Sequence, residues 1–437
     1  MKTNFNTDEI KVVLHRLMFA MTTFIKWLAC SVVCGVVLGL IGTFFYKLLG
    51  LVTVFRETNP WILFGLPVAG LLIVLCYRLP GETRNTGTNL VITAIQSNDE
   101  VPVHVAPLII LSTLLTHLCG GSAGREGAAL QVGGSLGNFF AKLLHFDDKD
   151  TRIMIMCGMS ACFSALFGTP IAAAVFSMEV ISVGVMYYAA LVPCVVSALT
   201  AQSIAKYFGI AGTHFALGEL PDFTIASGGK ILLMSVLFAC VSILFCVALH
   251  TASRLYTTYF ENPFIRIFIA GLLVIALRFI FQTTDFLGAG APVIAASFTA
   301  RCAWYVFLLK ILFTSVTLGG GFKGGEIVPT LFIGATLGSF LSGFFGLPAG
   351  LCAACGMVSV FCGVTNCPIT SLILAIEMFD MAGMKYCALC IAVSYLLSGY
   401  YSLYNSQKIM YSKYRTEFIN RNICKNSRLQ CFIRQDS

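Results

Sequence analysis

Two glycine-rich stretches of this chain each carry one glutamate, Glu126 in the first and Glu326 in the second. Glycines let backbone N–H groups come close to a ligand, and a helix that begins just after them favours an anion at its N-terminus. An ionised carboxylate at such a site competes with a bound anion for the same donors, and a protonated one leaves the site open. Both residues are therefore candidates for coupling the movement of a small anion to that of a proton.

The chain repeats this arrangement. Glu126 and Glu326 lie 200 positions apart, and four further features recur at a spacing of 198. In the first half these features are Gly158, Phe163, Pro170 and Glu179, and in the second they are Gly356, Phe361, Pro368 and Glu377. Two halves with glycine-interrupted apolar segments at matching positions are typical of a transporter whose site lies where broken helices meet.

Glu179 and Glu377 each end a long apolar stretch. A charge at the centre of a membrane span costs about 2.5 to 3.5 kcal/mol or more, so each needs a partner or a function. For these two we expect a cap on a helix N-terminus or a pair with an arginine, rather than ion handling. The matching Pro170 and Pro368 are expected to begin helices.

The composition predicts a membrane protein. Hydrophobic residues make up 57% of the chain and charged residues only 11%, with a mean hydropathy of +0.86. So few polar side chains cannot cover a soluble globule. We expect an all-α polytopic membrane protein, with a cytoplasmic segment at 1–25, a first half at 26–208, a second half at 209–405 and a basic cytoplasmic tail at 406–437.

Basic residues cluster before the first span and after the last. By the positive-inside rule both termini face the cytoplasm, which gives an even number of full crossings. The absence of sorting motifs and of large soluble extensions suits a bacterial inner membrane. The basic tail has no folded module around it that would indicate nucleic-acid binding.

Enzyme and metal chemistry are weaker interpretations. Gly120 to Gly124 overlaps the G-x-S-x-G pattern of serine hydrolases, but that pattern requires a strand before Ser122, whereas Leu108 to Leu118 is expected to be helical, with only His117 nearby as a base. Most of the eighteen cysteines lie in apolar segments, where they act as small hydrophobic residues. No metal or cofactor is expected.

The sequence Gly124-Arg125-Glu126-Gly127 resembles the G-(K/R)-E-G motif of the CLC family of chloride channels and anion/proton antiporters. In the second half, Gly325 to Pro329 stands where that family carries G-x-F-x-P. The resemblance extends from about residue 25 to residue 405. It implies a homodimer in which each subunit has its own ion pathway and is built of two inverted halves whose broken helices meet at a central anion site.

The resemblance also implies roles for particular residues. Glu126 would be the gating and proton-coupling glutamate, and Glu326 would relay protons or shape the site. Residues expected to contribute to anion binding are Thr88, Asn89, Gly124, Arg125, Gly127, Ile327, Val328 and Tyr404.

The departures from the usual pattern are similar to the fluoride-exporting branch, CLC-F. Ala128 replaces the proline after the gating motif, Glu326 precedes Ile327 in the second motif, and Val180 stands where chloride antiporters carry a second, proton-delivering glutamate. Val328 departs from that branch too, since a hydroxyl residue is expected there. The resemblance implies fluoride/proton antiport, with a chloride/proton exchanger or a passive chloride channel as the alternative.

Overall fold

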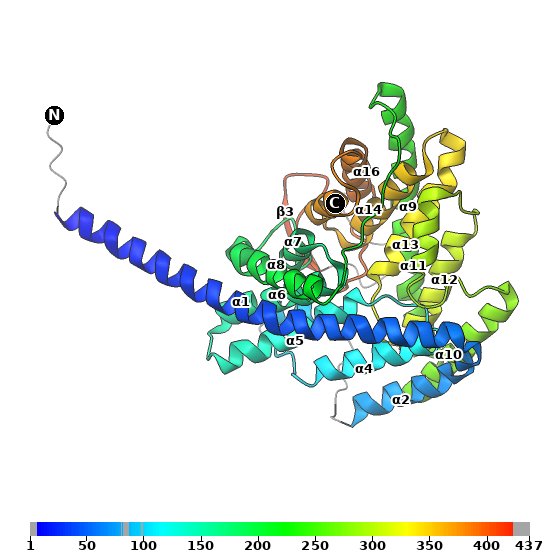
Figure 1. Cartoon of the computed structure of the whole chain (residues 1–437), viewed down its shortest axis with the longest axis horizontal. Coiled ribbons are helices and arrows are strands. Elements are labelled where there is room, and N and C mark those ends of the chain that lie inside the picture. The colour runs from blue at the N-terminus through cyan, green and yellow to red at the C-terminus, as the bar shows by residue number, and fades with distance from the viewer. Residues whose placement is uncertain (1–6, 80, 82–86, 98, 423–437) are drawn as a thin grey trace, which may run out of the picture.

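The computed structural model describes residues 7–79, 81, 87–97 and 99–422, which form sixteen α-helices, two short 3-10 helices and three short strands (Figure 1). The helices of the first half are α1 (Thr7–Thr58), α2 (Leu66–Arg78), α3 (Thr88–Ser97), α4 (Val105–Leu118), α5 (Glu126–Leu143), α6 (Asp148–Phe167), α7 (Pro170–Glu179) and α8 (Leu191–Tyr207). Those of the second half are α9 (Ile225–Tyr259), α10 (Pro263–Phe281), α11 (Ala291–Thr299), α12 (Val306–Gly319), α13 (Ile327–Phe345), α14 (Ala349–Thr365), α15 (Pro368–Phe379) and α16 (Met384–Leu397). The 3-10 helices are η1 (Pro60–Gly65) and η2 (Tyr188–Ala190), and the strands are β1 (Ser182–Val183), β2 (Lys408–Tyr411) and β3 (Phe418–Asn422).

The sequence repeat is a repeat of helix packing. In the first half α5 packs on α6 where Gly133 meets Gly158, and in the second half α13 packs on α14 where Gly334 meets Gly356. A Cβ on any of these four glycines would collide with the backbone of the facing helix. Glycine at each contact therefore lets the two helix axes approach closely, as small residues do between membrane helices.

The two prolines of the repeat begin helices, as the sequence predicts. Pro170 is the first residue of α7 and Pro368 the first of α15, and both helices are short, with 10 and 12 residues. Proline suits this position because its missing N–H would have no partner within the helix.

Glu179 in the first half caps a helix of the second half, and Glu377 in the second half caps a helix of the first. The Glu377 carboxylate accepts hydrogen bonds from the N–H groups of Ile171 and Ala172 at the start of α7, both at 2.9 Å. The Glu179 carboxylate accepts from Ile369 N at 3.0 Å and Thr370 N at 2.8 Å at the start of α15. The expected cap is therefore present twice, and each time it joins the two halves of the chain.

Replacing Glu377 with glutamine should destabilise the fold, because the neutral amide has only one oxygen for two N–H donors at a helix N-terminus. Hydrogen bonds to charged groups contribute about 1.5 to 3 kcal/mol, so the midpoint of thermal unfolding in detergent should fall by a few degrees. Glu261→Gln is the matched control, since Glu261 is exposed just before α10. Equal midpoints for the two variants would show that the cap contributes nothing.

Seven of the described helices are long and apolar enough to cross a membrane, and others are apolar but shorter. The longest is α1, which extends well beyond the body of the molecule at its N-terminal end (Figure 1). The boundary expected at residue 26 lies inside this continuous helix.

The segment after α16 folds back onto the helices instead of forming a separate tail. Strand β2 pairs in parallel with β1 and antiparallel with β3. The Gln407 side chain, just before β2, is fully buried and donates to the carbonyls of Val180 at 3.0 Å and Thr365 at 2.8 Å. Part of the region expected as a basic tail therefore closes the ends of α7 and α14.

Candidate functional site

The two glycine-rich loops meet each other between the halves. Gly124 N donates to Gly325 O at 2.6 Å, and Gly325 N donates to Gly124 O at 2.7 Å. This small antiparallel bridge joins the loop before α5 to the loop before α13. The start of α5 therefore lies directly against the second glycine-rich loop, as expected for broken helices that converge on one site.

Glu126 is the first residue of α5 and its side chain is fully buried. Its Oε2 accepts a hydrogen bond from Arg125 N at 3.1 Å, and its Oε1 lies 3.4 Å from Arg125 Nε. The carboxylate thus turns back over the N-terminus of its own helix, where free N–H groups and the helix dipole favour negative charge. An anion bound there would have to displace it.

Glu326, Thr88 and Gly127 meet at a second point. A Cβ placed on Gly127 would lie 3.1 Å from Glu326 Oε2 and 3.2 Å from Thr88 Oγ1. The absence of a side chain at Gly127 therefore leaves room for the carboxylate of one half and the hydroxyl of the other. Glu126, Glu326 and Tyr404 lie within electrostatic range of one another, and together with Thr88 and Gly127 they are called the cluster below.

Two hydroxyls of this cluster are buried. Within the described part of the chain, neither Thr88 Oγ1 nor Tyr404 Oη makes a hydrogen bond of normal geometry, and Thr88 Oγ1 lies beside the Glu326 carboxylate. A buried hydroxyl without a partner is costly, and it is tolerated where a ligand or water completes it. Both residues are among those expected from the sequence to bind the anion.

Tyr404 is held by a buried polar network that the sequence did not predict. Tyr404 N donates to Ser402 Oγ at 3.1 Å, and Ser402 Oγ donates to Gln407 Oε1 at 3.0 Å. Asn366, at the end of α14, also donates to Gln407 Oε1, at 3.1 Å. Every polar atom of the Gln407 amide is engaged on backbone or side-chain partners, so the turn that carries Tyr404 is fixed to the ends of α7 and α14.

The other predicted anion-binding residues fall into two groups. Ile327 and Val328 are buried in the first turn of α13, directly after Glu326. Asn89 is partly buried, and its Oδ1 accepts from Ser406 N at 2.9 Å. Its side chain therefore supports the segment that follows Tyr404.

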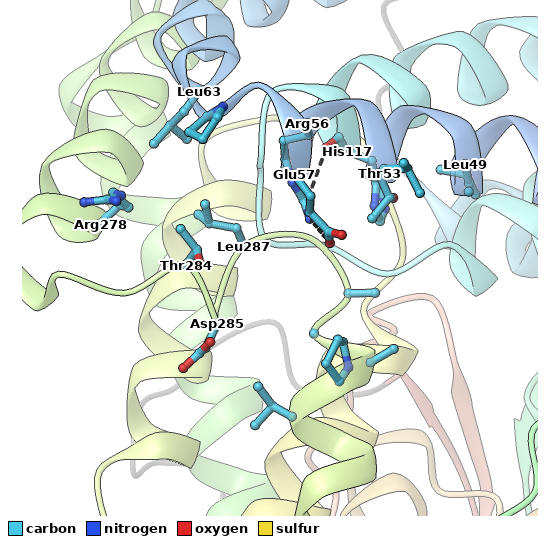
Figure 2. Close-up of a pocket in the computed structure, with 18 of the residues that line it drawn as sticks. Leu49, Thr53, Arg56, Glu57, Leu63, His117, Arg278, Thr284, Asp285 and Leu287 are labelled. Atoms are coloured by element: carbon cyan, nitrogen blue, oxygen red, sulfur yellow. Dashed lines mark hydrogen bonds and ion pairs between the residues drawn. The ribbon is translucent and has the colours of Figure 1, made fainter.

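Arg125 lies between the Glu126 carboxylate, 3.4 Å from its Nε, and an open cavity of about 790 Å³ that it helps to line. Its guanidinium lies 4.4 Å above the ring of Tyr46, and its side chain is 25% exposed. Figure 2 shows the wall of this cavity, where Arg56 bonds to the His117 carbonyl at 3.3 Å and to Glu57 at 3.3 Å. The cavity reaches Arg125, the residue just before α5, and part of its wall is cationic.

A buried lysine supports one wall of this cavity. Lys310 Nζ, in the middle of α12, donates to Gly288 O at 2.8 Å and to Phe286 O at 3.2 Å. It thereby fixes the loop that carries Asp285 and Leu287 of the cavity wall. The sequence offers no sign of this role beyond one lysine inside an apolar run.

The geometry around Ser122 does not resemble a serine hydrolase. Ser122 Oγ pairs with Thr314 Oγ1 at 3.0 Å, and the His117 ring contacts Gly124 O at 3.2 Å. A nucleophile would need a base within hydrogen-bond reach. In the described ranges no group of three or more histidine, cysteine or acidic residues could hold a metal ion.

A buried carboxylate at a helix N-terminus, where two matching membrane halves meet, is the kind of site found in channels and secondary transporters for small ions. The chain belongs to the CLC family: the family model described as voltage gated chloride channel matches residues 68–399. Membership in a family of channels and transporters fits a protein that is not an enzyme.

A chloride/fluoride channel protein of Pseudomonas syringae pv. tomato is 35% identical over 396 residues, which cover 89% of this chain and 88% of that protein. A crystal structure of a CLC-type fluoride/proton antiporter matches with a TM-score of 0.85 and 34% identity, covering 90% of this chain and 99% of that one. An H(+)/Cl(-) exchange transporter of Yersinia pestis is 24% identical over 63% of this chain and 61% of its own length.

Proposed function

We propose that this protein is a secondary antiporter that moves fluoride out of the cell in exchange for protons. The observation that carries the proposal is the pair of buried hydroxyls of Thr88 and Tyr404 in the same cluster as the carboxylates of Glu126 and Glu326. Fluoride is small and strongly hydrated, so it needs strong hydrogen-bond donors to replace its water. The Tyr404 hydroxyl, which has no hydrogen-bond partner among the described residues, and the Thr88 hydroxyl beside Glu326 can supply such donors.

The proposed mechanism uses Glu126 as a gate. When ionised, its carboxylate accepts from Arg125 N and excludes the anion from the start of α5. When protonated, it no longer balances the positive end of the helix, and an anion takes its place. One proton therefore moves with each opening of the site, which couples the two ions.

Glu326 is proposed to pass protons toward Glu126 or to shape the anion site beside Thr88. Its position three residues from Pro329, in the second glycine-rich loop, places it on the opposite half of the chain from Glu126. The family resemblance supports a homodimer, and the basic residues at the two ends of the chain support a cell inner membrane with both termini in the cytoplasm.

Ion flux from proteoliposomes tests this function. Fluoride and chloride electrodes are read together with internal pH, using the purified full chain. Fluoride efflux that drives protons uphill, with little chloride movement, is the expected result. Comparable chloride flux with proton movement would assign the protein to the chloride/proton exchangers, and chloride flux without protons would assign it to the channels.

Thr88→Val is expected to raise the fluoride concentration for half-maximal flux about tenfold, because a lost hydrogen bond to a charged group costs about 1.5 kcal/mol or more. Thr113→Val is the matched control, since Thr113 in α4 is also buried without a hydrogen-bond partner among the described residues. Equal concentrations for the two variants would remove Thr88 from the anion site.

A further inference from the structure

A second, smaller pocket lies away from the central cluster, between the end of α2 and the start of α10. Its volume is about 270 Å³. Three cationic residues line it together with Tyr77, and they are Arg78, Arg266 and Lys323. The rest of the lining is apolar or glycine, from Ile73, Val74, Pro263, Ile267, Gly320 and Gly321.

Among the described residues, no carboxylate pairs with the cations that line this pocket. Within the described ranges no acidic group lies at ion-pair distance from Arg266 or Lys323. Lys323 Nζ instead lies over the ring of Tyr77, 4.7 Å from its centre. A partly buried lysine that lies over an aromatic ring, with no acidic partner in the described part of the chain, favours an anionic ligand.

Arg266 makes the imbalance larger. It lies in the first turns of α10, where the helix dipole is positive and where α10 carries no acidic residue. A cation at that end of a helix is unfavourable by itself. Gly321 leaves the space beside it open, since a Cβ there would approach no atom closer than 3.9 Å, and the Arg266 Nε would be 4.0 Å away. The space between Arg266, Lys323 and Gly321 therefore suits a small anionic group.

The apolar lining and the neighbouring surfaces indicate what carries this group. Leu72, Leu75 and Leu79 of the α2 segment are exposed, as are Ile265, Phe268 and Leu272 of α10. In a membrane-spanning chain such surfaces face lipid. With the N-terminus in the cytoplasm, a chain that crosses in α1 and returns in α2 brings Arg78 back to the cytoplasmic side, where anionic lipids attract basic residues.

We propose that Arg78, Arg266 and Lys323 bind the phosphate of an anionic phospholipid whose acyl chains lie along α2 and α10. The phosphate supplies the negative charge that the pocket lacks, and arginine and lysine are its usual partners. Because Lys323 lies in the same loop as Glu326, the bound lipid would also hold the second glycine-rich loop in place. The cytoplasmic placement rests on the proposed function, but the pocket and its charges do not.

Native mass spectrometry of the purified full chain tests the site by counting bound phospholipid. The probe is phosphatidylglycerol, with phosphatidylcholine of the same chains and inorganic phosphate as the other arms. The wild type should retain phosphatidylglycerol in preference to phosphatidylcholine, and Arg266→Gln with Lys323→Gln should weaken its binding about tenfold. Lys149→Gln is the matched control, because Lys149 is exposed at the start of α6.

Equal retention by the wild type and the double variant would overturn the proposal, and so would equal retention of the two lipids. Competition by millimolar inorganic phosphate would instead make this a pocket for a soluble anion. If the double variant does not fold, Arg78→Gln at an exposed position should still weaken binding in the same direction. Lipid retention does not depend on transport, so its failure is distinguishable from failure of the antiport proposal.

Discussion

Replacing Glu126 with glutamine is expected to reduce proton movement to background while fluoride still crosses the membrane. Glutamine keeps the size of the side chain but cannot release a proton, so it resembles only the neutral, protonated form of glutamate. It also removes the charge that faces Arg125 N and Nε at the start of α5. The site therefore loses the exchange of carboxylate for anion on which coupling depends.

The measurement follows fluoride efflux and internal pH together in proteoliposomes that contain the Glu126→Gln variant. Glu57→Gln is the control. Glu57 lies near the C-terminal end of α1, in the wall of the large cavity, and its side chain is 60% exposed. Proton coupling should survive in this control. Uphill proton movement that persisted in Glu126→Gln would rule out Glu126 as the coupling residue.

The second large effect is expected for Gly325→Ala. A Cβ at this position would lie 2.5 Å from Gly127 N, closer than real Cβ atoms come to other atoms, and a tight 3.0 Å from Glu126 N. The second loop would have to move off the start of α5, which would break its bridge to Gly124 and displace Glu326 from Thr88. We expect fluoride flux to fall at least about tenfold, as small misplacements at reactive sites commonly cause.

Gly50→Ala provides the control for this variant. Gly50 lies inside α1, and a Cβ there would meet no atom within 4 Å. Alanine in a helix interior is favoured over glycine by roughly 0.5 to 1 kcal/mol, so this variant should transport normally and unfold at an equal or higher temperature. Normal flux in a folded Gly325→Ala protein would show that the contact between the two loops is not needed for transport.

Much of the core architecture could be predicted because it depends on local signals. Helix starts at Pro170 and Pro368, the helix that begins at Glu126 and the repeat of the two halves all follow from residue types at fixed spacings. The capping role expected for Glu179 and Glu377 is confirmed. Their partners could not be predicted, because each lies about 200 residues away in the opposite half.

The parts of the site that depend on long-range packing were not predictable. Asn89 was expected to bind the anion, and its bond to Ser406 spans 317 positions. Gln407 has no distinguishing pattern around it in the sequence, yet it links Val180, Thr365 and Asn366. The polar residues after α16 show no hydrophobic periodicity that would predict their burial. Their contacts can be identified only in the folded chain.

The reciprocal glutamate caps also determine the order in which this protein can be completed during synthesis. The start of α7 is capped by Glu377, which lies 206 positions after Ile171. A ribosome adds roughly 5 to 20 residues per second, so Glu377 is synthesised on the order of tens of seconds after α7. Through that interval the first half has an open helix end in the membrane, and α7 reaches its final state only when the last quarter of the chain has been inserted beside it.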